Sequence, residues 1–337
     1  MNIQIVTKLS IKKLLTICFI LIVLFSGLFF VKFSPDYNIY YSTLNYNIKQ
    51  FDLKQYEPIH WLIIFFNQII FKGNVYTFCL IYDILIMLLF TTAIKKYSLN
   101  FLLSFIIFLF LFWPNFGLIQ IRQGAAVGLF MLSIEDIIKR NAFGYYLKII
   151  LAILFHYSAI ILIPFYFLKS TKINRLIYLL LPILGLLFYK FFFTLNFFIK
   201  ISQFLPEPMS LKLINYINYF KLEGTTSSIN RINFFNLFSI SLLFIYYFFL
   251  VFSKFNNNYE IFFLKLLCWS LFTWFGFGQL PVLSFRITNF LYPSIIFLLP
   301  FISIIFKQKK IINAFIYTWS FIMFINMYLL SSLFVIK

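Results

Sequence analysis

Apolar runs long enough to cross a bilayer recur along the whole sequence, and only short polar stretches separate them. A transmembrane helix needs about 20 mostly apolar residues, and no block of soluble-domain size interrupts the series. The pattern predicts an all-α polytopic membrane protein, a single membrane domain over residues 1–337 with about 9–11 transmembrane helices, one or two of them re-entrant or broken. The runs expected to cross are residues 14–31, 75–94, 99–113, 117–137, 176–196, 232–252, 261–280, 287–306 and 311–334.

Two further apolar segments are not expected to cross. Residues 58–71 are too short to span comfortably and open with a proline, which favours a re-entrant or interfacial helix on the outer side. Residues 142–168 have basic clusters at both ends and hold His156 and Ser158 near their middle. These features predict a broken, re-entrant hairpin with His156 at its tip. Such a tip is expected to line a cavity, because non-helical backbone at membrane depth needs protein or water around it.

The composition points to the same environment. Hydrophobic residues make up 63% of the chain and charged residues 11%, which is more apolar surface than a soluble domain can bury. Lysine and arginine number 28 against 9 acidic residues. We assign most of this excess to membrane topology and anionic lipid headgroups, and expect no nucleic-acid partner.

The basic clusters predict the orientation, because cytoplasmic loops collect lysine and arginine. Placing all of them inside makes the N-terminus cytoplasmic. The outer side then receives residues 31–57, a turn at residues 113–115, an outer loop at residues 197–231 and a turn at residues 281–286. The clusters are Lys8/Lys12/Lys13, Lys95/Lys96, Lys139/Arg140, Lys169/Lys172/Arg175, Lys254 and Lys307/Lys309/Lys310.

Familiar cofactor motifs are missing from the sequence. It contains no Walker A loop, no HExxH zinc helix, no CxxC pair and no Asp-x-Asp metal motif. ATP-driven and divalent-metal-dependent nucleotide-sugar chemistry therefore lose their usual signatures. This absence weakens both of these interpretations, and we expect no cofactor.

Arg122 is the most informative isolated polar residue. It lies about one turn inside an otherwise apolar helix, where a charge is costly unless it is paired or hydrated. One interpretation is a side chain that snorkels to the outer headgroups, and the other is a clamp for an anionic ligand. Gly124 and Gly128 form a small-xxx-small face that permits close helix approach, which indicates a helix buried in the bundle. That placement favours the anion clamp.

A set of residues along nearly the whole chain forms a recognisable pattern. Its members are Arg122-Gln123 with Ala126, the basic turn Lys139/Arg140, Ala152, Phe155-His156, Ser158-Ala159, Asp36-Tyr37 with Tyr40, Glu57-Pro58, and Arg286 with Tyr292. Together these residues resemble the EpsG family of Wzy-like polysaccharide polymerases. The chain departs at Ser34-Pro35, where the family often has glycine beside an aspartate of the first outer loop.

The resemblance implies a bacterial cell-surface polysaccharide polymerase in the cytoplasmic (inner) membrane. Such an enzyme joins oligosaccharide repeat units carried on polyprenyl pyrophosphate at the outer face, without nucleotide sugar and without metal. The product could be an O-antigen, a capsule or an exopolysaccharide. A chain-length regulator and a flippase are the expected protein partners.

That reaction needs cations for the departing pyrophosphate and a base for the acceptor hydroxyl. Arg122 and Arg286 suit the first role, because guanidinium binds phosphate oxygens and a low dielectric strengthens the interaction. His156, Asp36 and Glu57 are the candidate bases. Each has a structural alternative: a hydrogen bond at the hairpin tip for His156, and a turn or helix cap for either carboxylate.

Five more residues are candidates for binding the substrate, with positions in the same predicted outer regions. They are Gln123, Ser158, Tyr37, Asn289 and Tyr292. Ser158 could instead cap the second half of the hairpin. His60 either orients Glu57, which precedes it by three residues, or lies at the membrane interface.

Two other function classes fit a membrane protein of this composition. A flippase or exporter of lipid-linked sugars needs no catalytic base and should show paired repeats, with polar residues in both leaflets. A membrane acyltransferase that modifies a polysaccharide would keep its histidine and arginine but place them on the cytoplasmic side.

Overall fold

The structure is a computed structural model that describes residues 27, 30–45, 56–205, 207–223, 233–306 and 308–330. Most of the predicted span 14–31, the cluster Lys8/Lys12/Lys13 and Lys307 lie outside these residues. The elements are η1 (Phe30–Phe33), α2 (Tyr37–Asn45), α3 (Pro58–Phe71), α4 (Val75–Tyr97), α5 (Phe101–Leu111), η3 (Pro114–Ile119), α6 (Ile121–Ile138), α7 (Ala142–Phe155), η4 (Tyr157–Phe167), α8 (Arg175–Phe191), α9 (Leu195–Ser202), α10 (Glu207–Glu223), α11 (Leu237–Phe252), α12 (Asn258–Gly276), α13 (Pro281–Leu291), η6 (Tyr292–Ser294), α14 (Ile295–Leu298), η7 (Leu299–Phe301), α15 (Ile302–Ile305), α16 (Lys309–Phe324) and η8 (Ile325–Leu329).

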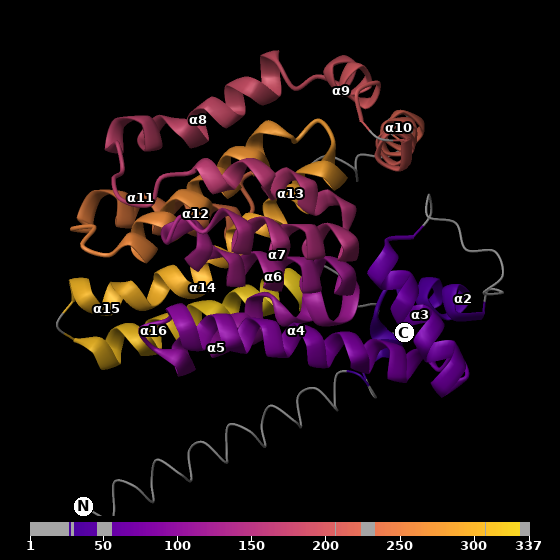
Figure 1. Cartoon of the computed structure of the whole chain (residues 1–337). Coiled ribbons are helices and arrows are strands. Elements are labelled where there is room, and N and C mark those ends of the chain that lie inside the picture. The colour runs from indigo at the N-terminus through magenta and orange to yellow at the C-terminus, as the bar shows by residue number, and fades with distance from the viewer. Residues whose placement is uncertain are drawn as a thin grey trace, which may run out of the picture.

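The long helices lie side by side in a bundle, and α2, α3, α9 and α10 gather at one end of it (Figure 1). The protein is an all-α polytopic membrane protein. Helix α4, the run from α13 to α15, and the run from α16 to η8 are each long and apolar enough to cross a membrane, and the pair α8 and α9, bent by 87°, is a fourth candidate. The larger predicted number of crossings stays a prediction.

The run from α13 to α15 forms the centre of the bundle, whereas the run from α16 to η8 lies at its edge. Of their most apolar windows, 83% of the first is buried inside the protein but 22% of the second. Aromatic rings fill the core, as where Phe263 stacks on Phe297 with centroids 4.7 Å apart. The edge helix instead leaves apolar side chains free to face lipid.

Helix α6 meets its neighbours unusually closely because glycine lines two of its contacts. A Cβ on Gly124 would lie 2.7 Å from the Cβ of Phe116 in η3, and one on Gly128 would lie 2.7 Å from the Cβ of Leu89 in α4. Both distances are too short for real atoms. The predicted small-xxx-small face is confirmed, and it packs α6 inside the bundle.

The predicted break at His156 is also confirmed. Helix α7 ends at Phe155, and η4 runs back beside it, so that the Tyr145 hydroxyl donates to the Leu162 carbonyl. Arg140 and Tyr166 close the open end of the hairpin, where each side chain donates to the other residue's carbonyl. The hairpin therefore enters and leaves at the same end of the bundle.

Basic residues from distant parts of the chain meet at that same end. Glu135 pairs with Lys96 and with Lys139, and the pair with Lys139 has an N–O distance of 2.6 Å. Arg175 donates to the carbonyls of Val251 and Ser253, the latter at 2.9 Å. Glu135 is thus paired over one helical turn, whereas Asp136 pairs with Lys148 of α7, at an N–O distance of 2.6 Å.

Three segments that were predicted to be outer turns or loops contain helices instead. Residues 113–115 do not form an exposed turn, because Pro114–Ile119 is a buried π-helix. Arg286 is not on a turn, since Pro281 begins α13 and Arg286 lies within it. The loop predicted at residues 197–231 contains the end of α9 and all of α10, and its residues 206 and 224–231 lie outside the described part.

Candidate functional site

Glu57 is the centre of a buried polar cluster. It occupies the N-cap position of α3, where Pro58 starts the helix, but its side chain makes no capping hydrogen bond. Its Oε2 accepts a hydrogen bond from Arg122 Nη1 at 2.5 Å, and its Oε1 lies 3.4 Å from His156 Nδ1. The capping alternative for the Glu57 side chain is wrong, because this fully buried carboxylate bonds to Arg122 and lies beside His156 and makes no capping hydrogen bond.

Arg122 enters the cluster from the first turn of α6. Its side chain is 32% exposed and pairs with Glu57, which supplies the partner that a charge in an apolar helix needs. The backbone leaves helical geometry at Gln120, between η3 and α6, which brings the start of α6 beside α3. One of the five N–H donors of the guanidinium bonds to Glu57.

His156 lies at the tip of the hairpin in extended backbone, with φ −156° and ψ 112°. The ring is buried and lies face to face with Phe290, at a centroid distance of 6.4 Å. Within the described residues, neither Nδ1 nor Nε2 has a hydrogen-bond partner, although Glu57 Oε1 lies 3.4 Å from Nδ1. A buried ring nitrogen in this state is available to a ligand or a proton.

Asp36 and Arg286 face the cluster from two further segments. Burial raises the pKa of the Asp36 carboxyl, and the positive charges of Arg122 and Arg286 oppose that rise. In the part of the chain that the structure covers, no ion pair within 4.0 Å joins Asp36 to either arginine. The carboxylate and the two guanidinium groups therefore share an electrostatic environment without direct pairing.

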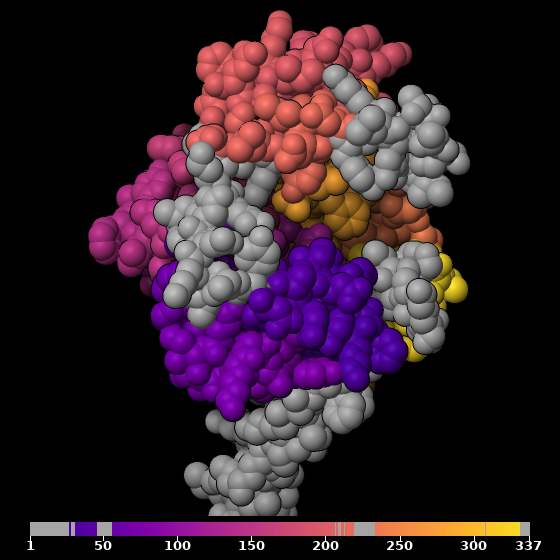
Figure 2. All heavy atoms as spheres, turned by 90° about the vertical axis from the view of Figure 1, so that its right-hand side faces the viewer, coloured from indigo at the N-terminus to yellow at the C-terminus, as the bar shows by residue number. Residues whose placement is uncertain are grey.

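The guanidinium of Arg286 lies 4.9 Å from the ring centre of Tyr216 in α10. This contact connects α10 to the site across the end of the bundle. Figure 2 shows this end face hollowed between the α2–α3 block, in indigo, and the α9–α10 block, in salmon.

Hydrogen bonds fix α13 against α6. Gln123 Nε2 donates to the carbonyl of Arg286 at 2.6 Å, and Asn289 Nδ2 donates to Gln120 Oε1 at 2.7 Å. Ser34 and Tyr40 donate to carbonyls at the end of η3, which holds the segment around Asp36 in place. The backbones that carry the two arginines are thus set relative to each other by side-chain hydrogen bonds between α6 and α13.

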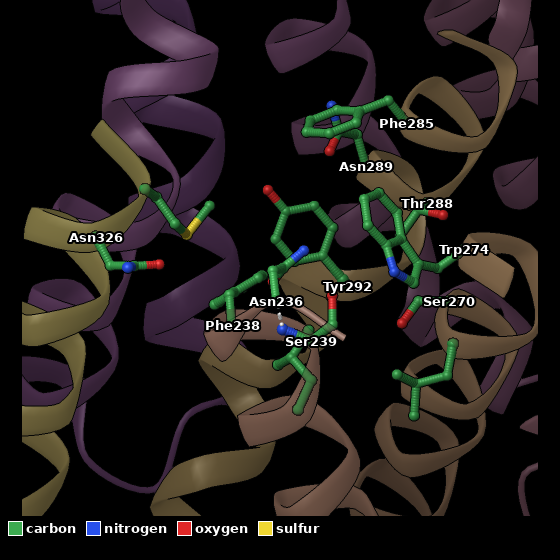
Figure 3. Close-up of a pocket in the computed structure, with 13 residues that line it drawn as sticks. Asn236, Phe238, Ser239, Ser270, Trp274, Phe285, Thr288, Asn289, Tyr292 and Asn326 are labelled. Carbon is green, nitrogen blue, oxygen red and sulfur yellow. Dashed lines mark hydrogen bonds between the residues drawn. The ribbon is translucent and has the colours of Figure 1, made fainter. Parts of the chain in front are cut away.

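A pocket of about 250 Å³ opens on the other side of Asn289, between α11, α12, α13 and η8 (Figure 3). It combines aromatic rings with amide and hydroxyl groups, as binding sites for small polar molecules do. Figure 3 shows Tyr292 in the middle of it, with Asn326 on one side and Trp274 on the other. The polar and aromatic residues that line it include Asn236, Phe238, Ser239, Ser270, Trp274, Phe285, Thr288, Asn289, Tyr292 and Asn326.

The other predicted residues lie further from the cluster. Tyr37 begins α2 and stacks on Tyr41, with ring centres 6.4 Å apart. Ser158 does not cap η4, because η4 begins at Tyr157 and its N-cap residue is His156. His60 is buried, with its Nδ1 2.8 Å from the Tyr82 hydroxyl, so the interfacial alternative for His60 is wrong.

Sequence reasoning missed Gln120 and Trp274. Gln120 connects to Asn289 across 169 positions of the chain, and no local pattern marks such a contact. Trp274 lies far along the chain from Asn236 and Asn326, its neighbours in the pocket, so no local pattern marks it either.

Metal ligands do not cluster in the described residues, where no group of three His, Cys, Asp or Glu side chains could hold an ion. The expectation of a site without metal stays a prediction.

Comparison with known proteins gives one positive finding. The family model described as EpsG family matches residues 12–336, nearly the whole chain. No curated protein and no solved structure matches the chain.

Proposed function

Because the chain belongs to the EpsG family of Wzy-like polysaccharide polymerases, we propose that it joins repeat units carried on polyprenyl pyrophosphate at the outer face of the bacterial cytoplasmic membrane. The family supports a polysaccharide-polymerase role and a lipid-linked saccharide substrate in general. The observation that carries the finer proposal is the cluster in which Glu57 holds Arg122 and His156, with Arg286 and Asp36 facing it.

The two arginines bind the pyrophosphate of the donor. Among the described carboxylates, none pairs with the guanidinium of Arg286, so its charge is available to a phosphate. Arg122 keeps N–H donors beyond the one that bonds to Glu57. As the bond between the sugar C1 and the pyrophosphate breaks, negative charge grows on the departing oxygen, and both cations stabilise it.

Asp36 accepts the proton of the acceptor hydroxyl, which attacks C1 to form the new glycosidic bond. It is the better base of the two carboxylates, because it is only partly buried while Glu57 is fully enclosed and already paired. Its raised pKa makes the carboxylate a stronger base than an ordinary aspartate. The proton later leaves with the polyprenyl pyrophosphate.

Glu57 and His156 position Arg122. The carboxylate orients the guanidinium through its Oε2 and approaches the imidazole through its Oε1. The unpartnered Nε2 of His156 then serves as a hydrogen-bonding group for the phosphate or the sugar.

The pocket around Tyr292 takes a sugar of one repeat unit. Aromatic rings such as Trp274 stack on sugar faces, and amides such as Asn289 exchange hydrogen bonds with hydroxyls. Asn289 also bonds to Gln120, two positions before Arg122, so a sugar in the pocket is held close to the cluster.

The proposed orientation follows from the gathering of the basic residues at the opposite end of the bundle. Single cysteines at Tyr41, which is 55% exposed at the site end, and at Lys139 test it after replacement of the three native cysteines. A membrane-impermeant maleimide applied to intact cells should label position 41 alone. Labelling of position 139 alone would reverse the orientation.

Purified protein in liposomes with a lipid-linked repeat unit provides the test of the reaction. The wild type should lengthen the unit into a ladder on a gel, and Arg122→Ala, Arg286→Ala and Asp36→Asn should each abolish the ladder. Lys139→Ala, at the other end of the bundle, is the control and should extend normally. Extension by all three variants at the wild-type rate would contradict the proposed mechanism.

A further inference from the structure

A second cavity, of about 410 Å³, lies between η4, α12 and α13 and is distinct from the pocket around Tyr292. Its lining is almost entirely hydrocarbon, and its one side-chain hydroxyl, that of Thr273, lies 3.1 Å from the hydroxyl of Thr288. The cavity therefore offers mostly carbon surface, with the Thr273 hydroxyl already paired and the buried indole Nε1 of Trp269 without a hydrogen-bond partner among the described residues. Its walls include Ile161, Pro164 and Leu168 from η4, Trp269 and Phe272 from α12, and Ile287 and Leu291 from α13.

Helix α13 connects this cavity to the polar cluster. Successive residues of a helix are about 100° apart, so one helix can present three separate faces. One face carries Arg286 and Phe290, the partner of His156, and a second carries Phe285 and Asn289 on the Tyr292 pocket. The third carries Ile287 and Leu291 on the apolar cavity. The cavity thus begins one residue away from Arg286.

The wall formed by η4 is also connected to the polar cluster, because η4 follows His156 directly. Ile161 lies five positions after His156, on the arm of the hairpin that leaves the tip. This arm, η4, is an eleven-residue 3₁₀ helix that contains Pro164. Such helices are rarely longer than 3–4 residues and have poorer hydrogen-bond geometry than an α-helix. The wall formed by η4 can therefore adapt its shape to a flexible chain more readily than α12 can.

We propose that this cavity holds the isoprenoid chain of the donor lipid while its pyrophosphate lies at Arg286 and Arg122. The inference rests on the proposed function and adds where the carrier lipid binds. A lipid with a doubly charged head and a branched apolar tail needs cations and a hydrocarbon groove side by side, and α13 provides both on adjacent faces. Packing against the methyl branches, and not removal from water, selects this chain over the surrounding acyl chains.

A groove-filling substitution tests the proposal. Ile161→Trp places an indole in the cavity, and Ile163→Trp, on the same arm but 39% exposed and outside the lining, is the matched control. Both are assayed in liposomes with the repeat unit on a long polyprenyl pyrophosphate and on a geranyl pyrophosphate of two isoprene units. Ile161→Trp should raise the KM for the long-chain donor about tenfold and leave the geranyl donor within about twofold, since only the long chain fills the groove. Ile163→Trp should change neither.

An equal KM for the long-chain donor in Ile161→Trp and wild type would overturn the proposal, as would an equal rise for both donors. Failure of the proposed function looks different, because the wild type would then extend neither donor.

A binding measurement covers the case in which Ile161→Trp does not fold. A polyprenyl pyrophosphate carrying a diazirine in its tail should crosslink the wild type on residues 161–168 or 287–291. Excess unlabelled polyprenyl pyrophosphate should suppress this crosslink, and excess phosphatidylglycerol should not. Suppression by both would mean that ordinary acyl chains fill the cavity, and crosslinks elsewhere would mean that the isoprenoid chain binds elsewhere; either result would overturn the proposal.

Discussion

The two ends of the bundle both carry charged residues, but they hold them in different ways. At the basic end, Glu135 pairs with lysines whose side chains reach solvent, such as Lys139 with 66% of its side chain exposed. At the site end, the side chain of Glu57 is 1% exposed and contacts Arg122 and His156. A charged side chain loses little solvation free energy where water and headgroups surround it. It loses much more where protein alone surrounds it.

This difference suggests different roles for the two ends: membrane topology for the basic end and a reaction for the site end. Exposed ion pairs at the end of a helix contribute little stability, and the residues at the basic end suit topology. A buried carboxylate that holds an arginine and a histidine costs solvation free energy, so its retention needs another explanation, such as a reaction. Matched substitutions at the two ends can break or sharpen this contrast.

Removal of the proposed base should have the largest effect. Burial raises the pKa of Asp36, so the carboxylate form is lost as the pH falls through that raised value, and the rate of extension should fall with it. Asp36→Asn should remove this acid limb and slow extension by about 1,000-fold. Asp136→Asn at the basic end should leave the pH–rate profile of purified protein unchanged. An intact acid limb in Asp36→Asn would assign the limb to another group.

Glu57→Gln should lower the free energy of unfolding by about 3 kcal/mol, because it leaves the buried side of Arg122 without its counter-charge. Glu135→Gln removes a carboxylate from two exposed lysines and should cost under about 1 kcal/mol. Unfolding of both variants by titration with a denaturing detergent, followed by circular dichroism, measures the difference. Similar decreases in the free energy of unfolding of the two variants would contradict the proposed difference between the ends.

Arg286→Lys keeps the charge but removes the planar fork that binds two phosphate oxygens. We expect the rate of extension to fall about 30-fold, because an ammonium group cannot bind in the same bidentate geometry. Arg175→Lys makes the same change at the basic end, where the guanidinium donates to the carbonyls of Val251 and Ser253. Its rate in the gel assay should equal that of the wild type, and a comparable drop would point to a shared structural effect.

The smallest effect belongs to Lys139→Ala. Its ammonium group is largely exposed and pairs with Glu135 over one helical turn. The substitution should change the free energy of unfolding by less than about 0.5 kcal/mol and the rate of extension by less than about twofold. A loss of either above this level would show that the basic end takes part in more than topology.

Much of the fold could be predicted from the sequence, because apolar runs and basic clusters follow directly from the cost of burying polar groups in lipid. The break at His156 followed from basic residues on both sides of residues 142–168, and the structure has it. The buried π-helix at Pro114–Ile119 could not be predicted. Its shape depends on contacts with Ser34 and Tyr40, far away in the sequence, which override the local turn preference of proline and asparagine.

The candidate site shows a similar division. Arg122 and His156 could be singled out because a polar residue in an apolar run is rare. Their joint contact with Glu57 could not, because the three residues come from three elements and meet only through packing. Gln120 and Trp274 carried no local signal of their contacts.

The hairpin of α7 and η4 has a consequence for how this architecture changes in evolution. Its two arms return to the same end of the bundle, so the chain leaves the hairpin on the side where it entered. Lengthening it, shortening it or exchanging its tip therefore preserves the sidedness of every helix that follows, whereas loss of one full span inverts them all. The segment that carries His156 is thus free to diversify without reversing the rest of the protein.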